Sequence, residues 1–86
     1  MEYKKTYIAV YVKVSEVGVA LPVAIEWTDG RRYDIDKVIS VRKAPALYVG
    51  AVLTKKYEVK IEGKVRVLYE EMHTKRWFVE EKTRTK

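Results

Sequence analysis

The chain has 86 residues, a formal net charge of +6 and no cysteine. This length predicts one domain, residues 1–86, with a single thin core, and the missing cysteine excludes disulfides and thiolate metal sites. The first residues lead into an alternating run rather than an apolar block, and the longest apolar run is about half of what a membrane-spanning helix needs. We therefore expect a soluble, cytoplasmic protein. The absence of Asn and Gln is typical of heat-adapted proteins.

Alternating apolar and polar residues predict a long first strand over residues 4–14. Side chains alternate between the two faces of a strand. We expect the core on the face of Ile8, Val10, Val12 and Val14. The opposite face carries Tyr3, Lys5, Tyr7, Ala9, Tyr11 and Lys13.

The second strand is predicted over residues 19–28 and the third over residues 31–35. Between them, Asp29-Gly30 predicts a two-residue type I′ turn, which needs positive φ at both central positions. A fourth strand is expected over residues 38–43 after a break in phase. The apolar run 44–53 has no clear period of two, so it fits a buried crossing loop, a buried strand or a patch that pairs with another chain.

Two further strands, residues 56–62 and 65–70, flank a tight turn at Glu62-Gly63-Lys64. A polar loop leads to a last strand over residues 76–81 and a frayed basic tail at residues 82–86. No amphipathic helix of useful length is predicted. The pattern therefore indicates an all-β fold, a small antiparallel barrel of five to six short strands, SH3-like, with an OB-like barrel or a β-roll as alternatives.

The sequence contains no catalytic motif, and we predict no enzyme activity and no cofactor. His73 is the only histidine, and Glu70 precedes it at Glu-x-x-His spacing. A metal site would need ligands from elsewhere in the chain, so we expect a solvated His73 and no metal. Asp29 is explained by its turn, and Asp34 and Asp36 by the polar face of a strand.

Tyrosines interleaved with basic residues are typical of surfaces that stack nucleic-acid bases and hold phosphates. The candidate nucleic-acid or polyanion site consists of Tyr3, Lys5, Tyr7, Tyr11, Lys13, Arg31 and Arg32. Because Arg31 and Arg32 are adjacent in a strand, at most one can lie on this surface, which favours the first strand as its centre. A plain strand surface explains the same residues.

A second hypothesis is a protein-interaction or homodimer module without catalytic activity. Its candidate interface is the apolar run that contains Tyr48, Val49, Val52 and Leu53. The net charge favours the first hypothesis, because a basic domain attracts polyanions. The basic residues are nevertheless spread along the whole chain, as on an ordinary solvated surface.

Residues 25–38 follow the pattern W-x-D-G-R-x-Y-x-I-x-x-V, which resembles a segment of a family of small uncharacterised bacterial proteins. In that family the segment is followed by Y-x-V-x-I-x-G, L-Y-E and W-F-V-E, to which residues 57–63, 68–70 and 77–80 are similar. The likeness covers about residues 23–81. It implies a small β-barrel without an agreed function, so it assigns no functional residue.

Overall fold

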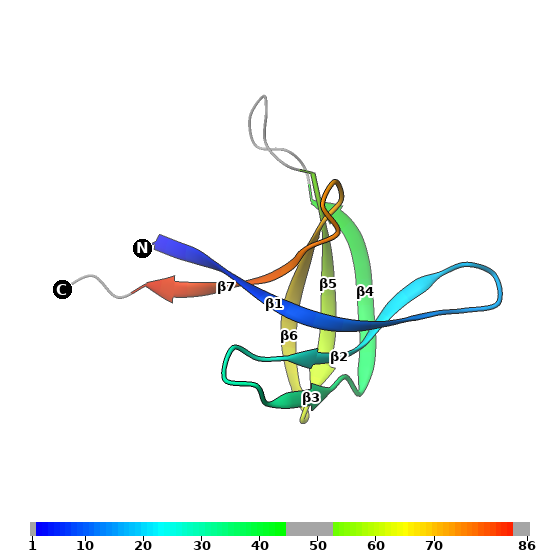
Figure 1. Cartoon of the computed structure of the whole chain (residues 1–86), viewed down its shortest axis with the longest axis horizontal. Coiled ribbons are helices and arrows are strands. Elements are labelled where there is room, and N and C mark those ends of the chain that lie inside the picture. The colour runs from blue at the N-terminus through cyan, green and yellow to red at the C-terminus, as the bar shows by residue number, and fades with distance from the viewer. Residues whose placement is uncertain (1, 45–52, 84–86) are drawn as a thin grey trace.

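The structure is a computed structural model that describes residues 2–44 and 53–83 (Figure 1). Its described residues form strands and turns but no helix, which confirms the all-β prediction. All paired strands are antiparallel, and their order in the sheet is β3-β2-β1-β7-β6-β5-β4. The strands are β1 (Glu2–Val14), β2 (Ala20–Glu26), β3 (Arg32–Asp34), β4 (Lys37–Ala44), β5 (Thr54–Ile61), β6 (Lys64–Glu71) and β7 (Trp77–Thr83).

The sheet curls into a half-barrel because its two edge strands, β3 and β4, follow one another in the chain. Ile35 N donates to Val23 O of β2 at 2.9 Å, while the next residue, Asp36, donates from its N to Lys60 O of β5 at 2.8 Å. Two neighbouring residues thus connect opposite ends of the sheet. The other side stays open, because β6 and β7 pair only at Tyr69–Phe78 and Glu70–Trp77.

The core lies on the inner side of the curled sheet. Alternation along β5 buries Tyr57, Val59 and Ile61 against Leu68 of β6. Val59 is 0% exposed and Leu68 is 1% exposed. Burying each such side chain stabilises the fold by about 1.5–3 kcal/mol. The core cluster is completed by Ile25 and Trp77, with Ile8, Val10, Trp27, Tyr33, Ile35, Val38 and Val79 packed against it.

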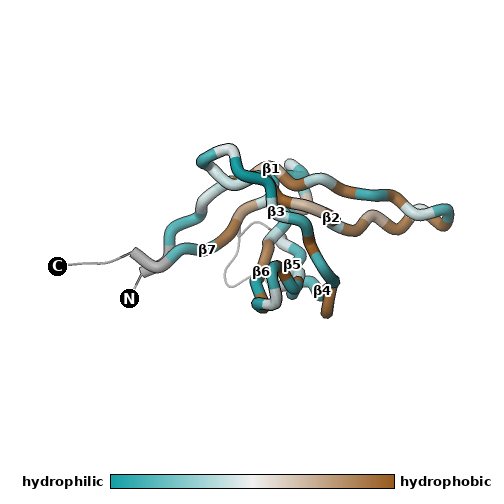
Figure 2. Tube along the Cα trace, turned by 90° about the horizontal axis from the view of Figure 1, so that it is seen from below, coloured by the Kyte–Doolittle hydropathy of each residue, from teal (hydrophilic) through white to brown (hydrophobic). Residues whose placement is uncertain are grey.

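The predicted core face of the first strand is only half correct. Ile8 and Val10 pack against the core, but Val12 is 41% and Val14 is 63% exposed. After Tyr11 the β1–β2 register shifts, and the rest of the hairpin projects away from the other strands (Figures 1 and 2). Alternation identifies residues that share a face, but no second layer from the described part of the chain covers this part of β1.

The predicted two-residue turn at Asp29-Gly30 is also wrong. Trp27 N donates to Arg31 O at 2.8 Å and Gly30 N donates to Trp27 O at 2.9 Å, so the turn has three residues between the hydrogen-bonded Trp27 and Arg31. Gly30 has a φ of 87°, whereas Asp29 keeps a negative φ. This pattern is a turn followed by a left-handed glycine. Asp29 instead accepts a hydrogen bond from Arg31 N through its Oδ1 at 2.9 Å.

Candidate binding surfaces

The predicted tyrosine–lysine face lies on the outer side of β1, opposite Ile8 and Val10. Tyr7 Oη donates to Glu71 Oε2 at 2.8 Å, and Lys5 Nζ lies 3.4 Å from the same oxygen. The guanidinium of Arg76 stacks 3.7 Å from the centre of the Tyr7 ring. One end of the predicted site is therefore held in contacts within the chain.

The other end of this face combines Tyr11 with Arg32. The Arg32 guanidinium lies 4.8 Å from the centre of the Tyr11 ring, and Tyr11 Oη donates to Glu26 Oε1 at 3.2 Å. Arg32 also forms a 3.3 Å ion pair with Asp34. Of the two adjacent arginines, the structure thus brings Arg32 to the tyrosine face.

Two of the remaining predicted residues, Arg31 and Lys13, lie apart from these two groups. Arg31 forms a 3.6 Å ion pair with Asp29 in its own turn. Lys13 is exposed and lies on the projecting part of the hairpin, opposite Leu21. Tyr3 is in β1, opposite Lys82 of β7. The structure therefore does not gather the seven residues into one cluster.

The electrostatics of the outer face are set by Glu71, which is only 5% exposed. The hydrogen bond from Tyr7 lowers the pKa of this carboxyl, and Thr74 and Lys5 lower it further, while burial acts in the opposite direction. Glu71 therefore remains ionised beside Lys5. An incoming phosphate would have to compete with this carboxylate for the lysine.

The predicted interface run falls mostly outside the described residues, which include Leu53 but not Tyr48, Val49 and Val52. Leu53 is 45% exposed, and its carbonyl oxygen accepts from Met72 N at 3.0 Å. His73 is exposed. Within the described ranges, no three His, Asp or Glu side chains are placed to hold a metal ion, and no helix is long and apolar enough to cross a membrane.

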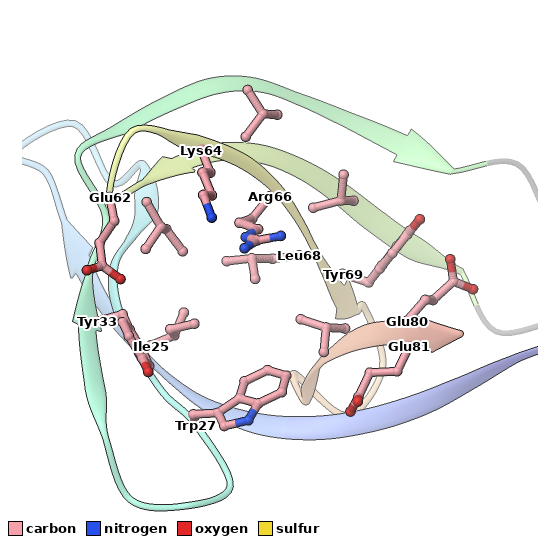
Figure 3. Close-up of a pocket in the computed structure, with 14 residues that line it drawn as sticks. Ile25, Trp27, Tyr33, Glu62, Lys64, Arg66, Leu68, Tyr69, Glu80 and Glu81 are labelled. Carbon is pink, nitrogen blue, oxygen red and sulfur yellow. The ribbon is translucent and has the colours of Figure 1, made fainter. Parts of the chain in front are cut away.

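An open cleft lies on the inner side of the sheet, where β6 and β7 diverge (Figure 3). Its volume is about 940 Å³. Ile25, Trp27 and Tyr33 line one wall and come from the β2–β3 hairpin. The facing wall is β6, and the end of β7 closes one end. The cleft is large for a chain of 86 residues.

Two basic side chains, Lys64 and Arg66, point into this cleft from β6 (Figure 3). Their cross-strand neighbours on β5 are Ile61 and Val59, both buried in the core. Since directly opposite residues share a face, Lys64 and Arg66 belong to the inner side. Neither takes part in any ion pair found among the described residues, in contrast to Lys5, Arg31, Arg32 and Arg42.

The aromatic wall of the cleft consists of Trp27 and Tyr33. Tyr33 lies opposite Ile25 in the β2–β3 ladder, and both aromatic side chains are partly buried against the core. Each has a surface that remains accessible from the cleft, because neither is fully buried. The aromatic wall and the basic wall face one another across the cleft (Figure 3).

Acidic side chains occupy the margins of the cleft. Glu81 accepts a hydrogen bond from Thr6, and Glu80 lies beside it at the β7 end (Figure 3). Glu62 lies in the β5–β6 turn, near Tyr33 (Figure 3). The central part of the cleft is therefore basic and aromatic, and its β7 end is acidic.

The sequence alone does not mark four residues of the cleft as one site: Trp27, Tyr33, Lys64 and Arg66. Trp27 and Tyr33 are partly buried against the core, so their packing alone does not mark them as site residues. A signal for the basic pair was present: the hairpin around Glu62-Gly63 places Lys64 and Arg66 across from the apolar positions Ile61 and Val59. The wall that faces them comes from the β2–β3 hairpin, which is distant in the sequence. The periodicity of a strand does not predict which distant strand it faces.

Comparison of the chain with protein-family models, with curated proteins and with solved structures finds no match. The resemblance of residues 25–38 to a bacterial family therefore stays a prediction.

Proposed function

We propose that this protein is a non-enzymatic module that binds single-stranded nucleic acid in the cleft between the β2–β3 hairpin and β6. One observation carries the proposal: Lys64 and Arg66, two cations that have no carboxylate partner within residues 2–44 and 53–83, face Trp27 and Tyr33 across an open cleft. Bases stack on aromatic rings while Lys and Arg hold phosphates. The net charge of +6 supports attraction of a polyanion.

The cleft is favoured over the outer face of β1 because the cations on that face are paired with carboxylates. Lys5 is paired with Glu71 and Arg32 with Asp34, so a phosphate gains less there. The two surfaces lie on opposite sides of the same sheet. A single strand that occupies the cleft therefore leaves Lys5, Tyr7 and Tyr11 free of contact.

The proposed barrel type is SH3-like with an extended first strand. Its support is the arrangement in Figure 1, where β4, β5 and β6 run across the direction of β1, β2 and β3. Small barrels of this kind and OB-folds both use open faces to bind ligands.

The test is fluorescence anisotropy of labelled single-stranded DNA and RNA at increasing salt. If Lys64 and Arg66 each contact one phosphate, the slope of log K against log salt includes about −0.7 from each. The double variant Lys64→Ala/Arg66→Ala should weaken binding and lose roughly 1.4 from the slope. Trp27→Ala should weaken binding by about 5- to 150-fold without changing the slope, because a stacked base contributes about 1–3 kcal/mol.

A matched control removes the same charge from the outer side of the sheet. Lys37 and Lys60 are exposed and lie opposite each other on β4 and β5. Lys37→Ala/Lys60→Ala should leave most of the affinity intact. The proposal is overturned if the wild-type protein fails to bind at low salt, or if both double variants weaken binding equally.

A second candidate, an extended peptide, is favoured by the edge of β6. In a two-residue hairpin the residues that flank the turn form a hydrogen-bonded pair, and hydrogen-bonded pairs recur at every second residue. Lys64 and Arg66 therefore hydrogen-bond to β5 through their backbones, whereas the N–H and C=O groups of Val65 and Val67 point away from β5. In the described part of the chain, pairing with β7 begins only at Tyr69. A peptide could add a strand along this edge.

Hydrogen exchange separates the two candidates. A peptide strand would slow exchange of the Val65 and Val67 amides, and its binding would depend only weakly on salt. Nucleic acid held by side chains would leave these amides exchanging as in the free protein and would dissociate at high salt.

A further inference from the structure

The part of the β1–β2 hairpin beyond the register shift, residues 12–23, forms a projecting arm (Figures 1 and 2). Val14 and Val19 are more than half exposed, and Val17 at the tip is 84% exposed. Folded monomers rarely leave this much contiguous apolar surface in water. The exposed apolar side chains of the arm are Val12, Val14, Val17, Val19, Leu21 and Val23.

Both faces of the arm are apolar. Val12 and Val14 lie on one face, and Leu21, opposite Lys13, lies on the other. A two-stranded hairpin alone is at best marginally stable in water. The arm should therefore be stabilised when another surface covers it.

A matching surface exists on the same chain. β4 is the last strand in the sheet, so its outer edge, the one away from β5, has no neighbouring strand among the described ones. Ile39 and Val41 of β4 are 46% and 44% exposed. Both views place β4 on the side of the molecule from which the arm projects (Figures 1 and 2).

We propose that the protein forms a two-fold homodimer in which the arm of each copy packs against the outer edge of β4 of the other copy. Because one copy carries both the arm and the β4 edge, a two-fold exchange covers both surfaces on both copies. Such a contact closes on itself and does not extend into a filament. The dimer does not depend on the proposed nucleic-acid site.

The exposed apolar area is sufficient for such a dimer. Counted over both faces of the arm and over β4, eight half-exposed aliphatic side chains set an upper limit on the order of 400 Å² per copy. Since interfaces are about 60% apolar, this corresponds to roughly 700 Å² in all per copy. A standard stable interface buries about 800 Å² on each partner.

Charge favours the partner's arm, rather than the partner's β4, as the surface that covers β4. β4 carries Lys37, Arg42 and Lys43, so direct β4–β4 pairing would bring like charges together. The arm carries one lysine, Lys13, and one acid, Glu16 at its tip. It therefore brings no net positive charge to β4.

Sedimentation velocity from about 1 to 500 µM tests the dimer. The wild-type chain should dimerise in the micromolar range, as expected for a small interface. Val14→Lys/Val17→Asp in the arm, and separately Ile39→Lys in β4, should each raise the dimer dissociation constant at least 10-fold. The control Val65→Lys, at a 56% exposed valine on β6, should leave the dimer dissociation constant unchanged. Circular dichroism and thermal melting establish that each variant is folded.

Mixing the two variants gives the sharpest result. In a reciprocal exchange, the arm of the Ile39→Lys chain is intact and the β4 edge of the Val14→Lys/Val17→Asp chain is intact. The mixture should therefore dimerise more strongly than either variant alone. A wild-type chain that stays monomeric at about 500 µM, a dimer unaffected by Ile39→Lys, or a mixture no stronger than its components would each overturn the proposal.

Discussion

Tyr7 and Glu71, 64 residues apart in the sequence, are joined by a 2.8 Å hydrogen bond from the phenol Oη to the carboxylate Oε2. The bond connects β1 to the end of β6, next to the short stretch where β6 pairs with β7. Glu71 also accepts from Thr74 and lies 3.4 Å from Lys5 Nζ. Residues that the sequence marks as a binding face thus hold the curled sheet together.

Replacing Tyr7 with Phe should lower the free energy of unfolding by about 1–3 kcal/mol, because it removes a hydrogen bond to a buried ionised acceptor. Urea unfolding near pH 7 measures the change. The control is Tyr11→Phe, whose bond to Glu26 is exposed and 3.2 Å long. Its cost should stay below about 0.5–1 kcal/mol. Equal losses in the two variants would contradict this account of the Tyr7–Glu71 bond.

The lowered pKa of Glu71 predicts a contribution to acid unfolding. A carboxyl whose pKa lies below its ordinary value of 4.5 in the folded state stabilises the fold above that value. This stability is lost as the pH falls below 4.5 and through the folded-state pKa. Glu71→Gln should therefore be less stable than wild type at neutral pH, and the difference should shrink as the pH falls. Unfolding free energies between about pH 7 and 2 measure it. A difference that stays constant with pH would show that ionisation is irrelevant.

The raised pKa of Tyr57 predicts that the free energy of unfolding falls at alkaline pH. Burial, followed by the charge of Glu70 and the 3.1 Å hydrogen bond to it, raises the pKa of Tyr57 to about 12. Below its ordinary pKa of 10.0 the neutral phenol contributes fully to stability, and this contribution is lost as the pH rises from 10.0 to about 12. The loss should reach roughly 2–3 kcal/mol. Tyr57→Phe should remove this part of the alkaline decline in urea unfolding, and an identical decline in both proteins would contradict it.

The two-residue turn between β5 and β6 depends on left-handed backbone at Glu62 and Gly63, with φ of 50° and 77°. Gly63→Ala should destabilise the protein by about 1 kcal/mol through backbone strain alone, because an added Cβ meets no atom within 4 Å. Glu62→Asn should be neutral or stabilising by a few tenths of a kcal/mol, since Asn tolerates this conformation. Thermal unfolding measures both. A neutral Gly63→Ala would show that the turn adapts without strain.

The positions of most strands could be predicted because alternation and turn residues are local signals. The hairpin around Gly63 and the alternation of Tyr57, Val59 and Ile61 are examples. The failure at Val12 and Val14 has a physical reason. Exposure depends on whether another layer reaches that part of the strand, and alternation contains no information about the second layer.

The candidate site was harder to predict than the fold. Whether a lysine is free depends on carboxylates from distant strands, as the Lys5–Glu71 pair shows. The cleft arises because β3 and β4 are consecutive and close the sheet on one side only. This closure brings Trp27 opposite Arg66 (Figure 3), although nothing in either local segment indicates the other.

The most direct test of the cleft as the nucleic-acid site is a titration of the ¹⁵N-labelled protein with a short single-stranded oligonucleotide at low salt, followed by NMR. We predict shifts of the Trp27 indole N–H and of the amides of residues 64–68, with the amides of Lys5, Tyr7 and Tyr11 unchanged. Shifts centred on the outer face of β1, or no shifts at all, would contradict the account.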